Sequence, residues 1–528
     1  MKPWLVVSTL LFLLAAFFSA DPWYYSILTA AQMIYVPLLL SNRQPEEGKS
    51  PLLLYGTGTA VVMVTILRLT GDMPWDAALG LLYFIFTILV AFHGVRRMVR
   101  RGFTNVEEFF LDVGYVYLGI GGFWFFAFVA EIDTGFYPLL TWLTSIHFHY
   151  AGFMLLTFLG LLGRRRKSRS YYTAGWSVVA APILLALGIS FSPILEVASV
   201  LLYIVGIYTL IATAWRTSFK NRMQELLCRI SFTSLGVTIL FSLAYALSQV
   251  MDGFVVTIEF MIMFHGVINM VAFGLTGVWG WSLAFPEATY QVPRFPVSNI
   301  TGGWRIGEHV LKGKEGGRSC SGLVDDFSIY VSEREEGEVH PEIVSFYEQT
   351  DKYRLYSRVC WHWWFYPFAV LYRAVSTVTK QINLPLSRQT YEMTGAIRSV
   401  SDKLDGRENT RAWIRKINES EVFIALYASH TSRGQTYMNI SLPLPFSAMA
   451  GILEVRRERE ELVLTSEKGN SESDAGTYLI VRGRPIVLPL TEHFRVSHEE
   501  NGVLCAVHTM RIFGLPFLTI HYRINRKG

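Results

Sequence analysis

The first 285 residues of the chain contain a series of apolar segments, each about as long as a lipid bilayer is thick. A helix needs roughly 20 apolar residues to cross a hydrocarbon core near 30 Å thick, because each residue adds about 1.5 Å. The sequence therefore predicts an α-helical polytopic membrane domain of about ten spans over residues 1–285. The predicted spans are 4–20, 24–40, 51–69, 75–93, 109–130, 138–162, 173–190, 193–213, 230–250 and 256–284.

The basic residues of this region lie almost entirely on one side of the predicted spans. Residues 1–285 hold 17 Lys and Arg, and 16 of them share one side if the chain alternates between the two faces. Cytoplasmic loops of membrane proteins carry an excess of Lys and Arg. We therefore predict a multi-pass protein of the cell membrane whose N-terminus and C-terminal domain are cytoplasmic. The first segment is alternatively a cleaved signal peptide, which would leave the later loops on the same sides.

The composition changes near residue 285. Residues 286–528 carry 30 Lys and Arg and 28 Asp and Glu, against 17 and 14 in the longer first part. Residues 286–340 are rich in glycine and charge, which predicts a linker followed by loops. Over residues 341–528 a helical pattern gives way, from about residue 411, to apolar residues alternating with a period of two. We expect a cytoplasmic α+β domain with six to eight strands in a curved antiparallel sheet.

Residues 361–368 read Trp-His-Trp-Trp-Phe-Tyr-Pro-Phe, the densest aromatic run in the chain. Such a run is typical of a segment that rests on a membrane surface. It is equally typical of the aromatic core of a domain. A concave sheet beside an aromatic helix is also able to enclose an apolar ligand.

Several ionisable or polar residues fall inside the predicted spans, where each costs roughly 2.5–3.5 kcal/mol on insertion scales. They are His147 and His149 in the sixth span, and Glu259, His265 and Asn269 in the tenth. Imidazoles bind metals and haem and titrate near neutral pH. The alternative is hydrogen bonding between closely packed helices. Because His147 and His149 lie about 200° apart on a helix, they would not both face one ion.

A second group consists of Glu107, Glu108 and Asp112 at the predicted cytoplasmic start of the fifth span. Arg96, Arg97, Arg100 and Arg101 precede it directly. Salt bridges at the membrane interface are the simpler interpretation, and an acidic catalytic site is the alternative.

The rest of the sequence argues against most enzyme classes. It contains no G-x-S-x-G, no G-x-x-x-x-G-K-[ST] and no H-E-x-x-H pattern. The four cysteines form no C-x-x-C pair. The net charge of +5 comes mainly from clusters beside the spans, so it indicates topology and no nucleic-acid partner.

Several strings together resemble the YndJ-like family of bacterial integral membrane proteins. The resemblance implies the two-part membrane architecture and carries no reaction, cofactor or catalytic residue. The strings are His147–Phe153, His265–Asn269, His340–Glu342 with Phe346–Glu348, Tyr437–Ile440 with Leu442–Pro445, and Phe513–Ile520.

Three functions are consistent with these features. The first is transport, sensing or scaffolding in the lipid bilayer, with a cytoplasmic domain that binds a lipid or a protein. The second is a haem- or metal-binding redox protein that uses His147, His149 and His265. The third is a membrane enzyme acting on lipid or envelope precursors, for which Glu107, Glu108 and Asp112 are the nearest candidates.

Overall fold

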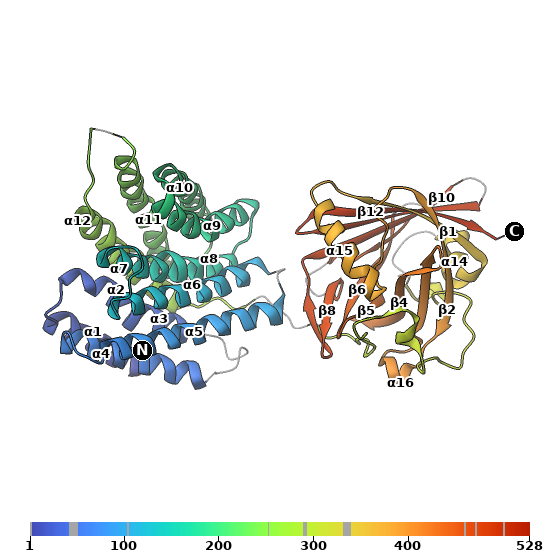
Figure 1. The fold of residues 1–528 in the computed structure, drawn as a ribbon, viewed down its shortest axis with the longest axis horizontal. Helices are drawn as coiled ribbons and strands as arrows, with labels where there is room; N and C mark the ends of the chain where they lie inside the picture. Colours follow the sequence, from blue (N-terminus) through green and yellow to red (C-terminus); the bar gives the residue numbers. More distant parts are fainter. Residues whose placement is uncertain are drawn as a thin grey trace. The chain divides into compact units, whose positions relative to one another are not determined.

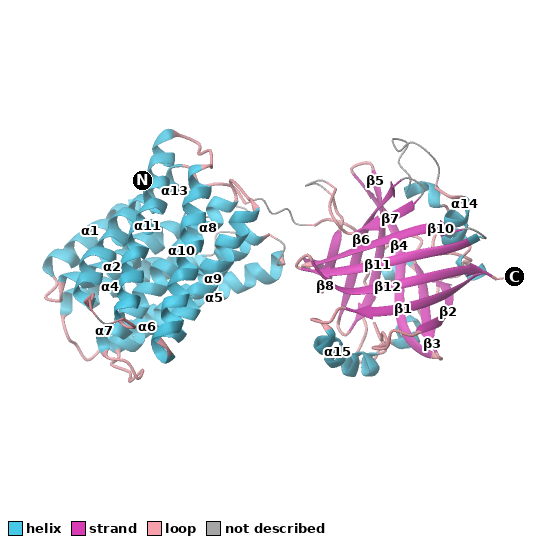
Figure 2. Ribbon diagram, turned by 90° about the horizontal axis from the view of Figure 1, so that it is seen from above, coloured by secondary structure: helices cyan, strands magenta, loops and turns pink. Residues whose placement is uncertain are grey.

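The computed structural model forms two compact units, one within residues 1–290 and one within residues 291–528 (Figure 1). Helices make up the first unit and strands dominate the second (Figure 2). The structure describes residues 3–41, 51–102, 105–251, 253–288, 293–330, 339–458, 461–469, 473–499 and 502–527.

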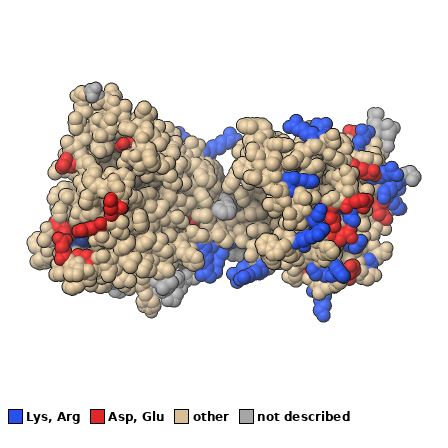
Figure 3. Space-filling view, in the orientation of Figure 1, with Lys and Arg blue, Asp and Glu red and all other residues tan. Residues whose placement is uncertain are grey.

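Within the described residues, the first unit has 9 helical segments that are long and apolar enough to cross a membrane. They agree with nine of the ten predicted spans. The first predicted span is instead a shorter apolar helix of 16 residues, α1 (Pro3–Phe18). The nine are Trp23–Ser41 (η1, α2, η2 and α3), α4 (Pro51–Thr70), α5 (Asp76–Arg101), α6 (Val106–Val129), Pro138–Gly163 (α7, η4 and α8), α9 (Arg169–Phe191), α10 (Pro193–Trp215), α11 (Arg222–Ser248) and Ile258–Leu283 (α12, η5, η6 and α13). On the face shown in Figure 3, the flank of this unit carries few charges and acidic residues gather near one end.

Three of the nine segments contain wide π-helical turns, which are uncommon in proteins and concentrate at functional sites. These turns are η2 (Ala31–Tyr35), η4 (Phe148–Met154), and η5 (Met261–Gly266) with η6 (Asn269–Leu275). The turns η2, η4 and η6 contact one another. Tyr35 donates a hydrogen bond of 2.9 Å to the Met270 carbonyl, and Tyr150 one of 2.7 Å to the Ile27 carbonyl. The wide turns and these hydroxyl groups therefore form the centre of the unit.

The second unit confirms the prediction of a curved antiparallel sheet, but the sheet closes into a barrel and has more strands than the six to eight expected. Ten strands form the ring β1-β2-β3-β4-β5-β6-β7-β10-β11-β12, and the hairpin β8–β9 extends from β6. Two pairings close the ring: β5 with β6, and β12 with β1, which joins Tyr353 to Arg526 and Trp361 to Leu518. The strands are β1 (Tyr353–Trp361), β2 (Thr390–Ser399), β3 (Arg411–Ile417), β4 (Ser420–Ser432), β5 (Gln435–Leu444), β6 (Ser447–Glu458), β7 (Glu461–Thr465), β8 (Gly476–Val481), β9 (Arg484–Val487), β10 (Leu490–Glu499), β11 (Val503–Ile512) and β12 (Leu515–Arg526).

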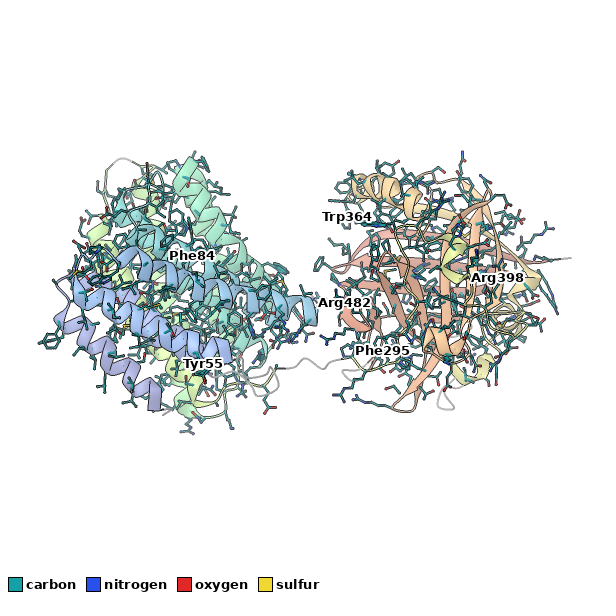
Figure 4. The ribbon with its side chains drawn as sticks, turned by 60° about the horizontal axis from the view of Figure 1, so that its bottom comes forward. Tyr55, Phe84, Phe295, Trp364, Arg398 and Arg482 are labelled. Carbon is teal, nitrogen blue, oxygen red and sulfur yellow. The ribbon has the colours of Figure 1, made fainter. Side chains whose placement is uncertain are left out.

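The two ends of the barrel are covered differently. At one end, the α14 end, helix α14 (Pro341–Glu348) and the short turn η8 (Phe327–Tyr330) contribute Phe346, Tyr347 and Phe327 to the core. At the other, the α15 end, the chain leaves β1 and forms helix α15 (Tyr366–Thr379). Trp364, beside the start of α15 in Figure 4, donates a 2.9 Å hydrogen bond to the Pro516 carbonyl.

Residues 293–330 are loops and short turns, and the first part of this segment packs against the outside of the barrel. Ile300, Ile306 and Leu311 form an apolar cluster with β3 and β4 residues such as Ile414 and Ile424. Because β3 is thus covered outside and faces the barrel interior inside, it is buried on both faces. Its sequence is accordingly apolar at consecutive positions.

Candidate functional site

The barrel encloses a cavity of about 550 Å³. Small-molecule sites are typically about 300–1,000 Å³ and mostly apolar. The wall consists mainly of inward-facing aliphatic and aromatic side chains, because alternate residues of each strand point to the same face. Examples from five strands are Leu355, Met438, Leu453, Phe494 and Ile520.

Side chains with polar groups also line this apolar cavity. Those on the strands include Arg415 on β3, Tyr427 on β4, Glu492 on β10, His508 on β11 and Tyr522 on β12. Burial raises the pKa of Tyr427 to about 12, and the positive charge of Arg415 acts in the opposite direction. Burial also raises the pKa of Tyr522, against the charge of Arg415 and a hydrogen bond with it. Arg415 therefore lies within electrostatic reach of both phenols.

Arg415 is held by aromatic rings. Its guanidinium carbon lies 4.5 Å from the centroid of the Trp413 ring and 4.3 Å from that of Phe423. Within the described part of the chain, no carboxylate forms an ion pair with Arg415, and its Nε has no hydrogen-bond partner. A guanidinium in such surroundings favours an anion, because its planar N–H groups match carboxylate and phosphate oxygens.

Two other titratable side chains of the cavity, Glu492 and His508, lie beside each other. Nε2 of His508 lies 3.3 Å from a carboxylate oxygen of Glu492, and the His508 ring stacks on Phe494 with centroids 3.6 Å apart. Gly451 on β6 leaves room for this carboxylate, since a Cβ there would lie 3.1 Å from Glu492 Oε1. Glu492 is thus paired with His508, and the charge of Arg415 is left for a ligand.

In the helical unit, His149 lies in the wide turn η4 and is fully buried. Its Nδ1 is 2.8 Å from the Ser145 carbonyl, and its Nε2 is 2.8 Å from the Tyr83 hydroxyl. Because a carbonyl only accepts, Nδ1 carries the proton and Nε2 accepts from Tyr83. Both ring nitrogens are therefore already hydrogen-bonded.

His265 and Asn269 are arranged in the same way. His265 Nδ1 lies 2.9 Å from the Thr238 carbonyl, and Asn269 donates to His265 Nε2 over 3.0 Å. The Asn269 side-chain oxygen accepts from Thr238 over 2.9 Å. Glu259, at the start of α12 (Ile258–Phe260), is exposed.

His147 differs from the other two histidines. Its Nε2 is buried with no hydrogen-bond partner among the described residues, and its ring meets that of Tyr203 edge-on with centroids 6.3 Å apart. The described residues include no group of three His, Cys, Asp or Glu side chains placed to hold a metal ion. The haem- or metal-binding function stays a prediction, and a metal at His149 or His265 would have to displace one of the bonds above.

Glu107, Glu108 and Asp112 lie buried at the start of α6 and form ion pairs. Arg97 on α5 pairs with Glu108 at 2.9 Å and with Asp112 at 2.8 Å. Arg164, directly after α8, approaches Glu108 at 2.7 Å, and Lys167 pairs with Glu107 at the same distance. The three acids thus join α5, α6 and the end of α8.

A second cavity, of about 540 Å³, lies in the helical unit. Arg68 lines it and forms an ion pair of 2.5 Å with Asp21. Arg68 also lies 4.9 Å from the centroid of the Tyr25 ring. Asp72, Asp76, Glu131 and Asp133 line the same cavity, so the charged side chains on its walls are mostly acidic.

The sequence suggested a concave sheet able to enclose an apolar ligand, but it predicted neither the closed barrel nor the polar residues of its cavity. Trp413 and Arg415 are two residues apart, so they lie on the same face of a strand. This spacing is the feature of the sequence that pointed toward the site. Which face points inward depends on the outer cover of β3 by residues 293–330. A distant loop of this kind gives no local signal.

A set of membrane-competent helices joined to a closed barrel with an internal cavity defines a multi-pass membrane protein with a separate barrel unit. Sequence comparison agrees. The family described as "YndJ-like protein" matches residues 26–273. The chain is 39% identical over 456 residues to "Uncharacterized membrane protein YndJ" of Bacillus subtilis (strain 168), covering 84% of this chain and 83% of that protein. The chain therefore belongs to the YndJ-like family, and the resemblance predicted from the sequence is confirmed. No solved structure matches it.

Proposed function

We propose that this protein is a membrane-anchored binding protein whose barrel holds one amphiphilic molecule with an apolar body and an anionic head. The observation that carries the proposal is the apolar cavity of about 550 Å³ with Arg415 inside it. Arg415 is half-buried and has no carboxylate partner among the described residues, so a bound anion would stabilise its charge in these apolar surroundings. Fatty acids and phospholipid-like molecules have the required chemistry.

The size and lining of the cavity support one bound molecule. An aliphatic wall favours an apolar body through the hydrophobic effect. The hydroxyls of Tyr427 and Tyr522 are suited to donate hydrogen bonds to the head bound by Arg415, because burial keeps both phenols protonated at neutral pH. Such a unit attached to membrane spans fits transport or sensing of a lipid-like compound.

Photo-crosslinking of the full chain tests this function. The protein is reconstituted in bilayers, irradiated with a diazirine-bearing fatty acid, digested and mapped by mass spectrometry. We expect labelled peptides from the cavity-lining strands β5, β10 and β12. Labelling confined to the helical unit would refute the proposal.

Cavity-filling variants provide the control for non-specific labelling. Ala425 and Ala506 line the cavity from different strands, so Ala425→Phe and Ala506→Phe are each expected to reduce barrel labelling at least several-fold. Ala396→Phe places the same side chain on an exposed position of β2 and is expected to leave labelling unchanged. Equal labelling in all three variants would also contradict a site in the cavity.

We further infer that both termini and the barrel face the cytoplasm. The support is the one-sided distribution of Lys and Arg in residues 1–285. A green fluorescent protein fused after Gly528 is expected to fluoresce, and alkaline phosphatase fused after Thr134 is expected to be active. Phosphatase activity from a fusion after Gly528 would reverse the orientation.

A further inference from the structure

Helix α15 has its small and polar side chains turned inward and its large apolar side chains turned outward. The residues that it buries are Ala369, Ser376 and Thr379. Phe368, Leu371, Val375 and Val378 are exposed, with Leu371 at 69% and Val378 at 67%. Their spacing of three, four and three residues places them on one face of the helix. A helix at the surface of a soluble protein shows the opposite arrangement.

The exposed apolar surface continues around the α15 end of the barrel. In an up-and-down antiparallel ring, the β5–β6 turn, the β11–β12 turn and the end of β1 lie at the same end. Each of them exposes large apolar side chains. These residues are Trp363, which is 86% exposed, Phe446, Phe513 and Leu515, together with Trp304, whose ring lies 5.2 Å from that of Phe446. We call α15 and these residues the apolar rim.

The apolar rim is continuous with the cavity. Phe368 and Tyr372 of α15 are exposed on the outside and also line the cavity. Helix α15 therefore separates the cavity of the barrel from the surroundings of the apolar rim by the thickness of one helix.

We propose that the apolar rim docks on the lipid bilayer, with the α15 stripe among the acyl chains and the barrel mouth facing the membrane. The chain is a membrane protein, and only 12 residue steps separate Leu283, the end of the last membrane-competent helix, from Phe295. Even a fully extended chain spans about 43 Å over that length. The barrel is therefore always within reach of the bilayer.

Two further features match a bilayer surface. Trp and Tyr side chains favour the interface between headgroups and acyl chains, and Trp363 and Tyr366 lie at the edge of the stripe. Between them, Arg388 lines a small surface cavity of about 280 Å³ with both rings. An arginine beside two aromatic rings at this edge is placed to meet a lipid phosphate. Docking itself needs no ligand in the cavity, so it does not depend on the proposed function.

Depth-dependent fluorescence quenching in the full chain tests the docking. Cys228, Cys320, Cys360 and Cys505 are replaced by serine, and L371C then carries a polarity-sensitive fluorophore in proteoliposomes. We expect nitroxide-labelled lipids to quench this probe at least threefold more strongly than the same probe on K403C, and iodide to quench it less. Lys403 is exposed in α16 (Asp402–Asp405), which joins β2 to β3 at the α14 end.

Either of two outcomes would overturn the proposal. Quenching of the Leu371 probe by iodide as strongly as at Lys403 would show that the stripe lies in water. Protection from both quenchers would show that a protein surface, such as the helical unit or a second copy, covers it.

A matched pair of variants separates docking from misfolding. In a chain labelled at V378C, L371E is expected to lower nitroxide quenching to the level of K403C. T377E introduces the same charge off the stripe and is expected to have no effect. Both residues are exposed, so neither change is expected to disturb the barrel, and an unchanged β-sheet infrared band is the check. Equal quenching in L371E and T377E would contradict docking through the stripe. Loss of ligand labelling in A425F with normal quenching would concern only the proposed binding in the cavity and would leave docking intact.

Discussion

Arg415 provides the positive charge in the otherwise mostly apolar barrel cavity. It places a positive charge between Trp413 and Phe423, near the hydroxyls of Tyr427 and Tyr522. Among the described lining residues the carboxylate of Glu492 is the other charged group, and it lies 3.3 Å from the His508 ring. A ligand head that meets Arg415 would therefore gain a charge-assisted hydrogen bond in apolar surroundings, where such bonds are strong.

Replacing Arg415 by methionine is expected to weaken binding of a fatty acid much more than binding of the corresponding fatty alcohol. Hydrogen bonds to charged groups contribute about 1.5–3 kcal/mol, which corresponds to roughly 10- to 100-fold in affinity. The measurement is competition of each compound against the photo-crosslinking probe in R415M. Arg354 is exposed on β1, and R354M serves as the control. A similar loss for the acid and the alcohol would show that Arg415 does not bind the head.

The residues of the cavity show where sequence patterns stop being informative. The alternation in β4 predicts a strand, and the strand exists. The pattern does not say which face is inward, because Val422, Ile424 and Leu426 on one face are as buried as Phe423, Ala425 and Tyr427 on the other. A polar residue such as Arg415 in a doubly buried region is identified as a site only once the ring has closed.

At the scale of elements, a buried ion pair ties the outer loops to the barrel. Arg407 Nε lies 2.7 Å from Asp405, and neither side chain is exposed. Arg407 also donates to the carbonyl and the side-chain oxygen of Asn439 on β5, each over 2.9 Å. Ser298 and Thr410 donate to Asp405 over 2.6 and 3.0 Å. The pair thus joins the β2–β3 connection to β5 and to the segment that precedes the barrel.

Removing one partner of this pair is expected to destabilise the barrel by about 3–5 kcal/mol, because the other charge stays buried without a counter-charge. The change is R407M, and the free energy of unfolding is followed in urea by the β-sheet infrared band, to which the helical unit does not contribute. Arg358, exposed on β1, provides the control variant R358M. The double variant D405L/R407M is expected to be more stable than R407M alone. A loss below about 1 kcal/mol in R407M would contradict the role of the network.

The elements themselves were only partly predictable. The sequence predicted a helical pattern from residue 341 and strands only from about residue 411, but α14 ends at Glu348 and β1 starts at Tyr353. Arg354 and Arg358 point outward from β1, between buried residues. The alternation of buried and exposed residues that is typical of a strand is therefore present, but over a short segment. The pairing of β1 with β12 joins residues more than 150 positions apart. No local pattern predicts such a pairing, which together with that of β5 with β6 converts a curved sheet into a barrel.

At the scale of the whole molecule, the distribution of apolar and charged residues along the chain predicted the architecture best. The length and hydropathy of a span depend on neighbouring residues alone, and for this reason nine of the ten predicted spans correspond to membrane-competent helices. The wide turns that hold His149 and His265 were not predicted, because they depend on how the segments pack. Both histidines engage their two ring nitrogens there, a bonding pattern that spacing along the sequence does not reveal.

The closed ring of ten strands also has a kinetic consequence. Each strand of the ring is hydrogen-bonded on both sides, so widening the wall would break a ladder of backbone bonds. A molecule held in the cavity therefore leaves through an end of the barrel. The α14 end is filled by Phe327, Phe346 and Tyr347, which leaves displacement of α15 as the shorter route. The residence time of a ligand would then depend on how often helix α15 moves aside. The contacts that hold α15 against the barrel would therefore set the dissociation rate.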